Sequence, residues 1–237
     1  MPRTEMAPSS LYRRWVVANG LSEGLGLATI FIVGDLMAGV IVDIDYDVRA
    51  AVAVAVALLL GMLAEGIVVA TAQAWVIRSV TAGFPWRPWV VATTLAVGLT
   101  WLLDAIGGVV ALVAPQLLAG VSREVNPLAF QVLTTVTGAT SGLVVGVLQR
   151  SVMPATFRRA RQWIWANVVA WALAMPLLGA GLSAIPWQGS RLVTWCALFL
   201  VCGSAGLMTG GITGVTLIKL VARPASSEPG SHERLAA

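Results

Sequence analysis

Four acidic residues lie inside long apolar stretches of the sequence: Glu23, Asp35, Glu65 and Asp104. A carboxylate at bilayer depth costs a few kcal/mol or more, so such a residue is a functional candidate by default. Counted along a helix, Glu65 lies about 20 Å and Glu23 about 14 Å from the nearest arginine of its own stretch. Both are therefore deep, whereas Asp35 and Asp104 lie near the opposite ends of their stretches and can reach water.

The two deep carboxyls have no Lys or Arg at their depth to pair with, so we expect both to carry a proton. They belong to consecutive apolar stretches and can approach each other. Asn19 precedes Glu23 by one helical turn and can hydrogen-bond it. The pair could accept a proton or bind a cation; the alternative is two neutral carboxyls hydrogen-bonded to the surrounding helices.

Other reactive constellations are missing from the sequence. It contains no Ser/His/Asp set, no Gly-x-x-x-x-Gly-Lys phosphate loop and no His-Glu-x-x-His pair. The single histidine is His232, near the C-terminus, and the two cysteines, Cys196 and Cys202, lie in an apolar stretch on different helix faces. We therefore expect no enzymatic activity, no metal site and no cofactor.

The composition predicts a polytopic membrane protein. Of 237 residues, 58% are hydrophobic and only 11% are charged, with a mean hydropathy of +0.85, whereas a soluble domain carries about 25% charged residues. Apolar stretches long enough to span a bilayer cover residues 15–42, 50–77, 89–113, 128–149, 162–185 and 192–218. Because the backbone must satisfy its own hydrogen bonds in hydrocarbon, we expect an all-α protein of six transmembrane helices.

The domain organisation follows from these spans. Residues 1–14 form a cytoplasmic segment, residues 15–221 the transmembrane domain, and residues 222–237 a disordered cytoplasmic tail. The net charge of +4 comes from basic residues scattered between apolar stretches, which argues against a nucleic-acid partner. The bilayer is the expected environment.

Basic residues fix the orientation. Twelve of the fifteen lie on one side of the predicted membrane, and only Arg49, Arg123 and Arg191 lie on the other. This positive-inside bias predicts a multi-pass protein of a bacterial-type plasma membrane with both termini in the cytoplasm. The tryptophans beside the basic segments are expected to anchor the helices at headgroup level: Trp15, Trp75, Trp86, Trp89, Trp163 and Trp165.

A helix start is repeated three times. Trp15-Val-Val-Ala-Asn19 recurs as Trp89-Val-Val-Ala-Thr93 and as Trp163-Ile-Trp-Ala-Asn167, at intervals of 74 residues. Each copy opens an odd-numbered span at the cytoplasmic side. The sequence thus predicts three helical hairpins, at approximately 15–78, 89–150 and 163–219, which could surround a pseudo-threefold axis.

The even-numbered spans share small residues at intervals of four, which lie on one helix face and let backbones approach closely. These are Gly138, Gly142 and Gly146 in the fourth span, Gly206, Gly210 and Gly214 in the sixth, and Gly66 with Ala70 in the second.

Aligning these small-residue faces groups polar residues at equivalent positions. Glu65, Ser141 and Thr209 precede the shared glycine, and Gln73 and Gln149 follow about two turns later. Such residues could form a polar layer in the bundle. The layer could hold the hairpins together by interhelical hydrogen bonds, each worth about 0.6 kcal/mol, or it could form a polar site on the axis.

Tandem Trp-x-x-Ala-Asn and Gly-x-x-x-Gly-x-x-Gln hairpins make the chain resemble a group of small bacterial polytopic membrane proteins. The resemblance covers Trp15 to Leu220 and includes the closing stretch Gly206-Leu-Met-Thr-Gly210-Gly-Ile-Thr-Gly214. The chain departs from the pattern at Thr93, where Asn is expected, and in the incomplete glycine run of its first repeat. The resemblance implies the architecture and does not extend to an activity.

Two functions remain open from the sequence. The first is a membrane interaction module, which packs through its glycine faces as a homo-oligomer or as an accessory subunit of a partner protein. The second is a small transporter or channel for protons, cations or a small solute that uses Glu65 and Glu23. The short loops and small-residue faces favour the first, and the deep carboxylates favour the second.

The predicted orientation can be tested by thiol labelling of whole cells. We expect an impermeant reagent to label Asp45→Cys from outside and to leave Arg158→Cys unlabelled until the membrane is permeabilised. A chain without Cys196 and Cys202 is the background. Labelling of position 158 in intact cells would contradict the orientation.

Overall fold

In the computed structural model, the chain is described over residues 7–42, 48–113, 126–155, 157 and 160–221. It consists there of α1 (Pro8–Val42), α2 (Val48–Val80), α3 (Trp86–Val113), α5 (Pro127–Ser151), α6 (Arg161–Ser183) and α7 (Arg191–Val221), with no strand among these residues. Each of the six helices is long and apolar enough to cross a membrane. The prediction of an all-α membrane protein is thereby confirmed.

The helix boundaries follow the apolar stretches closely. The largest difference is at the start, where α1 begins at Pro8, ahead of the predicted Trp15. At α5, the side-chain oxygen of Asn126 caps the helix by accepting from the backbone nitrogen of Ala129 at 3.0 Å, and Pro127 occupies the first turn. The predicted tail and the labelling positions 45 and 158 lie outside the described residues.

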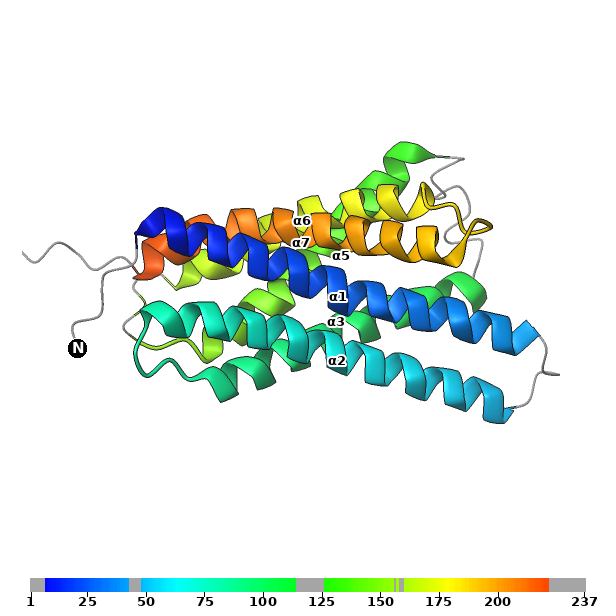
Figure 1. The fold of residues 1–237 in the computed structure, drawn as a ribbon, viewed down its shortest axis with the longest axis horizontal. Coiled ribbons are helices and arrows are strands. Elements are labelled where there is room, and N and C mark those ends of the chain that lie inside the picture. Colours follow the sequence, from blue (N-terminus) through cyan, green and yellow to red (C-terminus); the bar gives the residue numbers. More distant parts are fainter. Residues whose placement is uncertain (1–6, 43–47, 114–125, 156, 158–159, 222–237) are drawn as a thin grey trace, which may run out of the picture.

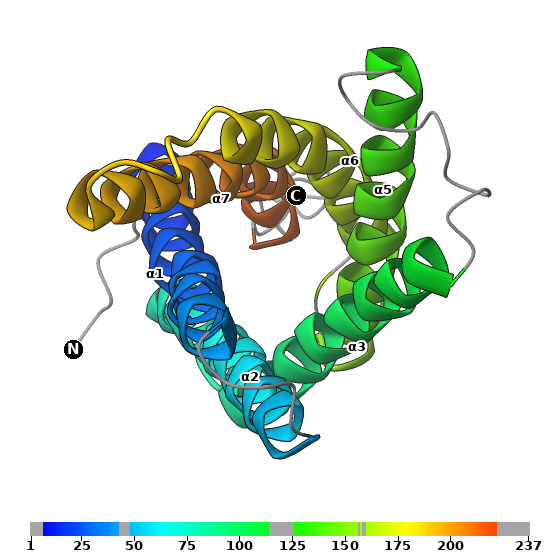
Figure 2. The same ribbon diagram turned by 90° about the vertical axis from the view of Figure 1, so that its right-hand side faces the viewer.

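The helices run along the long axis of the molecule (Figure 1) and form a ring in chain order (Figure 2). Each helix contacts the next, from α1 through α2, α3, α5 and α6 to α7, and α7 returns to pack against α1. The ring therefore has an interior that is lined by all six helices.

The glycine faces lie at the contacts between the predicted hairpins. A Cβ on Gly142 would overlap the backbone oxygen of Asn167 on α6, and a Cβ on Gly206 would lie 2.5 Å from the backbone oxygen of Asn19 on α1. The small-residue contacts join α2 to α3 through Gly66, α5 to α6 through Gly138, Gly142 and Gly146, and α7 to α1 through Gly206, Gly210 and Gly214. The predicted close packing occurs, and it occurs within one chain.

Two apolar clusters fill the interior. One gathers Trp15, Trp89 and Trp163 with residues of the α2–α3 and α5–α6 turns, and the other contains Leu27, Leu198 and their neighbours. Large apolar side chains on the opposite helix faces are exposed, which suits contact with lipid acyl chains.

The glycine contacts generate a stability prediction. Gly142→Ala should destabilise the protein by about 1–3 kcal/mol, because the added methyl meets backbone that cannot rotate away. Gly98, in the interior of α3, is the matched control, since a Cβ there meets nothing within 4 Å. Gly98→Ala should be neutral or stabilising by up to about 1 kcal/mol through helix propensity.

The measurement is the midpoint of denaturation of each purified variant in detergent micelles. Equal midpoints for Gly142→Ala and the wild type would show that the contact between α5 and α6 is looser than described.

Candidate functional site

A buried amide, Gln149 of α5, is the centre of a polar layer across the bundle. Its Nε2 donates to Oε1 of Gln73 at 3.1 Å and to Oγ1 of Thr93 at 3.0 Å. Its Oε1 accepts from the indole nitrogen of Trp163 at 2.9 Å. One side chain thus links α5 to α2, α3 and α6.

The layer continues to the remaining helices. Gln73 donates to Oδ1 of Asn19 at 2.8 Å, and Nδ2 of Asn19 donates to the backbone oxygen of Trp15 at 2.8 Å. The indole nitrogen of Trp15 donates to Oγ1 of Thr213 on α7 at 2.9 Å. These bonds supply hydrogen-bond partners to polar side chains, which the hydrocarbon around the bundle cannot provide. Gln73 and Gln149 therefore meet, while Asn19 is bonded to Gln73 and Trp15 rather than to Glu23.

The register of α7 differs from the predicted alignment. Trp163 donates to Gln149, and Trp15 donates in the same manner to Thr213. Thr213 therefore corresponds to Gln149, since each accepts a hydrogen bond from a tryptophan indole. The predicted alignment, which grouped Thr209 with Ser141, is thus shifted by one helical turn along α7. The alignment matched the first glycine of each run, whereas the helices are positioned by their contacts with the asparagine carbonyls of the next helix.

Three of the predicted interface tryptophans instead form a buried core at one end of the bundle. Trp15, Trp89 and Trp163 are 0%, 0% and 1% exposed, and the ring of Trp163 lies 5.8 Å from that of Trp15 and 5.9 Å from that of Trp89. Trp75 and Trp165, by contrast, are 66% and 68% exposed, as membrane anchoring requires. The buried and exposed tryptophans differ in the helix face that they occupy. Proximity to a basic segment does not predict that face.

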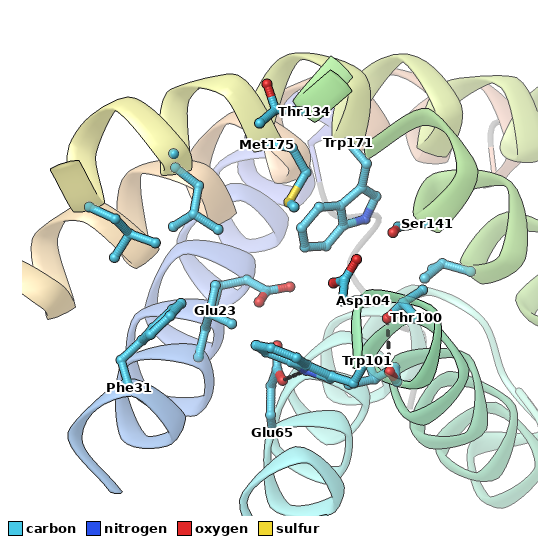
Figure 3. A pocket seen from close by; sticks show the side chains of 16 residues that line it. Glu23, Phe31, Glu65, Thr100, Trp101, Asp104, Thr134, Ser141, Trp171 and Met175 are labelled. Atoms are coloured by element: carbon cyan, nitrogen blue, oxygen red, sulfur yellow. Dashed lines mark hydrogen bonds between the residues drawn. The ribbon is translucent and has the colours of Figure 1, made fainter. Parts of the chain in front are cut away.

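On the other side of the layer, a cavity of about 190 Å³ lies between the helices. Three carboxyls line it: Glu23 from α1, Glu65 from α2 and Asp104 from α3 (Figure 3). The two deep acids thus share one cavity. Asp104, which the sequence places near water at the end of its span, is partly exposed and also lines this cavity.

The cavity wall is mixed in character. Hydroxyls come from Thr100, Thr134 and Ser141, and aromatic rings come from Phe31, Trp101 and Trp171. No Lys, Arg or His is among the described residues that line it. The predicted grouping of Glu65, Ser141 and Thr209 is only partly met, because Thr209 lies on a different cavity.

The two glutamates have different partners. Both are 4% exposed. Oε2 of Glu65 accepts a hydrogen bond of 2.8 Å from the indole nitrogen of Trp101. Oε2 of Glu23 is buried and has no hydrogen-bond partner. A buried polar atom without a partner is costly, so Glu23 is the group in the cavity most in need of a proton, a water or a ligand.

Glu23 also lines a second, smaller space of about 20 Å³, together with Asn19, Gln73, Gln149 and Thr209. That volume is enough for one water molecule. Glu23 therefore stands between the acidic cavity and the polar layer. Beyond the layer, the tryptophan cluster fills the bundle.

Three of these residues were absent from the sequence-based candidates: Thr93, Trp101 and Trp171. Two had usable signals. Trp101 and Asp104 are three residues apart and so share a helix face. Thr93 occupies the position of Asn19 and Asn167 in the predicted repeat, and its hydroxyl takes part in the layer.

The described residues contain no group of three or more His, Cys, Asp and Glu arranged to hold a metal ion. Comparison with models of protein families, with curated proteins and with solved structures found no match to this chain. Function must therefore be argued from the site itself.

The polar layer predicts unequal effects for two buried tryptophans. Trp163→Phe removes the donor to Gln149 and should destabilise the protein by about 1 kcal/mol more than Trp89→Phe. The indole nitrogen of Trp89 is buried without a partner, so its replacement loses no hydrogen bond. The comparison uses denaturation midpoints in micelles, and a larger loss in Trp89→Phe would refute the assignment of the layer.

Proposed function

We propose that this chain is a small membrane transporter or channel for cations, protons included, with Glu23 as the principal binding group. The observation that carries the proposal is the unpartnered Oε2 of Glu23, which is buried beside a cavity that also contains Glu65 and Asp104. Ionisable residues of this kind inside transmembrane bundles commonly mark ion or proton pathways.

Charge selects the sign of the ligand. Three carboxyls line the cavity, and no basic side chain of the described residues offsets them there. Desolvated walls focus the potential of these groups into the cavity. When its carboxyls release their protons, the site therefore favours cations and repels anions.

The two sides of Glu23 differ in a way that suits alternating access. On one side is the acidic cavity, and on the other are the one-water space and the tryptophan cluster. With the orientation expected from the basic residues, the closed side is the cytoplasmic side. The described arrangement then corresponds to a state that is closed toward the cytoplasm, and passage requires the bonds around Gln149 to open.

A pseudo-threefold arrangement of three hairpins is part of the proposal. Trp163 bonded to Gln149 and Trp15 bonded to Thr213 support it, as do the glycine contacts at each junction. The first hairpin breaks the pattern, because Oε1 of Gln73 accepts from Gln149 while the indole of Trp89 has no partner. The same hairpin carries both deep glutamates, so the departure from symmetry coincides with the site.

The interaction module loses its main support. It depended on glycine faces free to pack against a partner, and these faces pack against helices of the same chain. Exposed leucines and valines remain on the outer surface, but lipid covers such residues in any membrane protein. A homo-oligomer or partner subunit would have to be recognised through that outer surface.

The proposal predicts loss of cation flux in proteoliposomes. Glu23→Gln should reduce proton or alkali-cation flux at least tenfold, because the neutral amide can neither release a proton nor attract a cation. Glu65→Gln should reduce flux less, because Trp101 already bonds that side chain. The matched control is Asp35→Asn, an acid on the same helix as Glu23 that does not line the cavity.

Flux through wild-type vesicles equal to that through empty vesicles would refute the proposal, provided that the protein is folded by its denaturation midpoint. Equal flux in Glu23→Gln and the wild type would remove Glu23 from the pathway.

A further inference from the structure

The acidic cavity has a second kind of surface, made of aromatic rings. Trp101 and Trp171 lie on opposite sides of the space into which Glu23 and Asp104 point (Figure 3). Phe31 extends the wall, with its ring 6.5 Å from that of Trp101. Rings beside a carboxylate form a surface that attracts organic cations through their π faces as well as by charge.

We propose that the cavity binds a small organic ammonium ion, with its charged nitrogen at Glu23 and its apolar body between Trp101 and Trp171. This inference deepens the proposed function by naming the class of cation.

The size of the cavity fits this class. Its volume is about 190 Å³, and an apolar protein cavity of about 150 Å³ holds benzene. There is thus room for one ring or a short branched alkyl group together with an ammonium head. A bare alkali ion would leave most of this volume to water, against walls that include Leu27, Val97 and Leu178.

The hydrogen-bonding groups that the cavity wall leaves available are acceptors, which suit a cation. Oε2 of Glu23 is unpartnered, whereas Oε2 of Glu65 is already bonded to Trp101. Thr100 and Thr134 donate their hydroxyl protons to backbone oxygens of their own helices, at 2.8 Å and 3.0 Å. Both hydroxyls therefore offer only lone pairs to a ligand. Lone pairs, π faces and carboxyls all favour positive charge.

Equilibrium binding of benzyltrimethylammonium tests the inference. Its charge is permanent, so ligand protonation is not a variable, and neopentylbenzene is its neutral isostere. By titration calorimetry in micelles, with empty micelles subtracted, we expect saturable binding of the cation with one site per chain. The neutral isostere should bind at least tenfold more weakly.

Variants locate the site. Glu23→Gln should weaken binding of the cation at least tenfold, and Trp171→Leu should weaken it about threefold. The controls are Asp35→Asn and Trp75→Leu, an acid away from the cavity and a tryptophan on the exposed surface; neither should change the dissociation constant by more than about twofold.

Absence of saturable binding to the folded wild type would overturn the inference, as would equal binding of neopentylbenzene or an unchanged constant in Glu23→Gln. The isostere comparison needs only the wild type, so it decides the question even if a variant does not fold. Binding without cation flux would refute the proposed transport but keep this site. Proton flux without binding of benzyltrimethylammonium would do the reverse.

Discussion

The structure depends on the need to satisfy polar side chains where no water reaches. Gln149 meets this need for four helices at once, through bonds to Gln73, Thr93 and Trp163. Asn19 and Thr213 extend the layer to α1 and α7. Each bond is individually weak in a membrane, at roughly 0.6 kcal/mol, but mispairing would leave amides exposed to hydrocarbon. The layer therefore specifies which helices are neighbours more than it adds stability.

Against this well-bonded layer, Glu23 stands out. It lies one turn beyond Asn19, near a set of amides and hydroxyls that are almost fully partnered, yet its own Oε2 is not. The glycine faces bring α7 against α1 closely enough for Glu23 to contact Gly206. Tight packing on that side leaves the acidic cavity and the adjoining one-water space as the places where a partner for Glu23 can be accommodated. Both the helix packing and the hydrogen bonding therefore identify Glu23 as the carboxyl that can bind a ligand.

The sequence predicted features that depend on one helix at a time. Apolar length gave the six spans, and spacing of four gave the close-packing faces of α5 and α7. It failed where the answer depends on which way a helix face turns. Counting residues from the membrane edge assigned Trp15 to the interface, although its side chain is buried, and did not reveal that Asp104 lines the cavity. The offset of α7 was likewise set by contacts between helices, which no single-helix pattern contains.

A cavity that takes up a cation at Glu23 must have a negative potential once its carboxyls are deprotonated, and it must be accessible from one side only. The most direct measurement is the reaction rate of Ser141→Cys with impermeant thiosulfonates, since Ser141 lines the acidic cavity. A cationic reagent should react from the outer side much faster than an anionic reagent of similar size, and the preference should fall in Glu23→Gln. Equal rates for the two reagents, or faster reaction from the cytoplasmic side, would contradict the account.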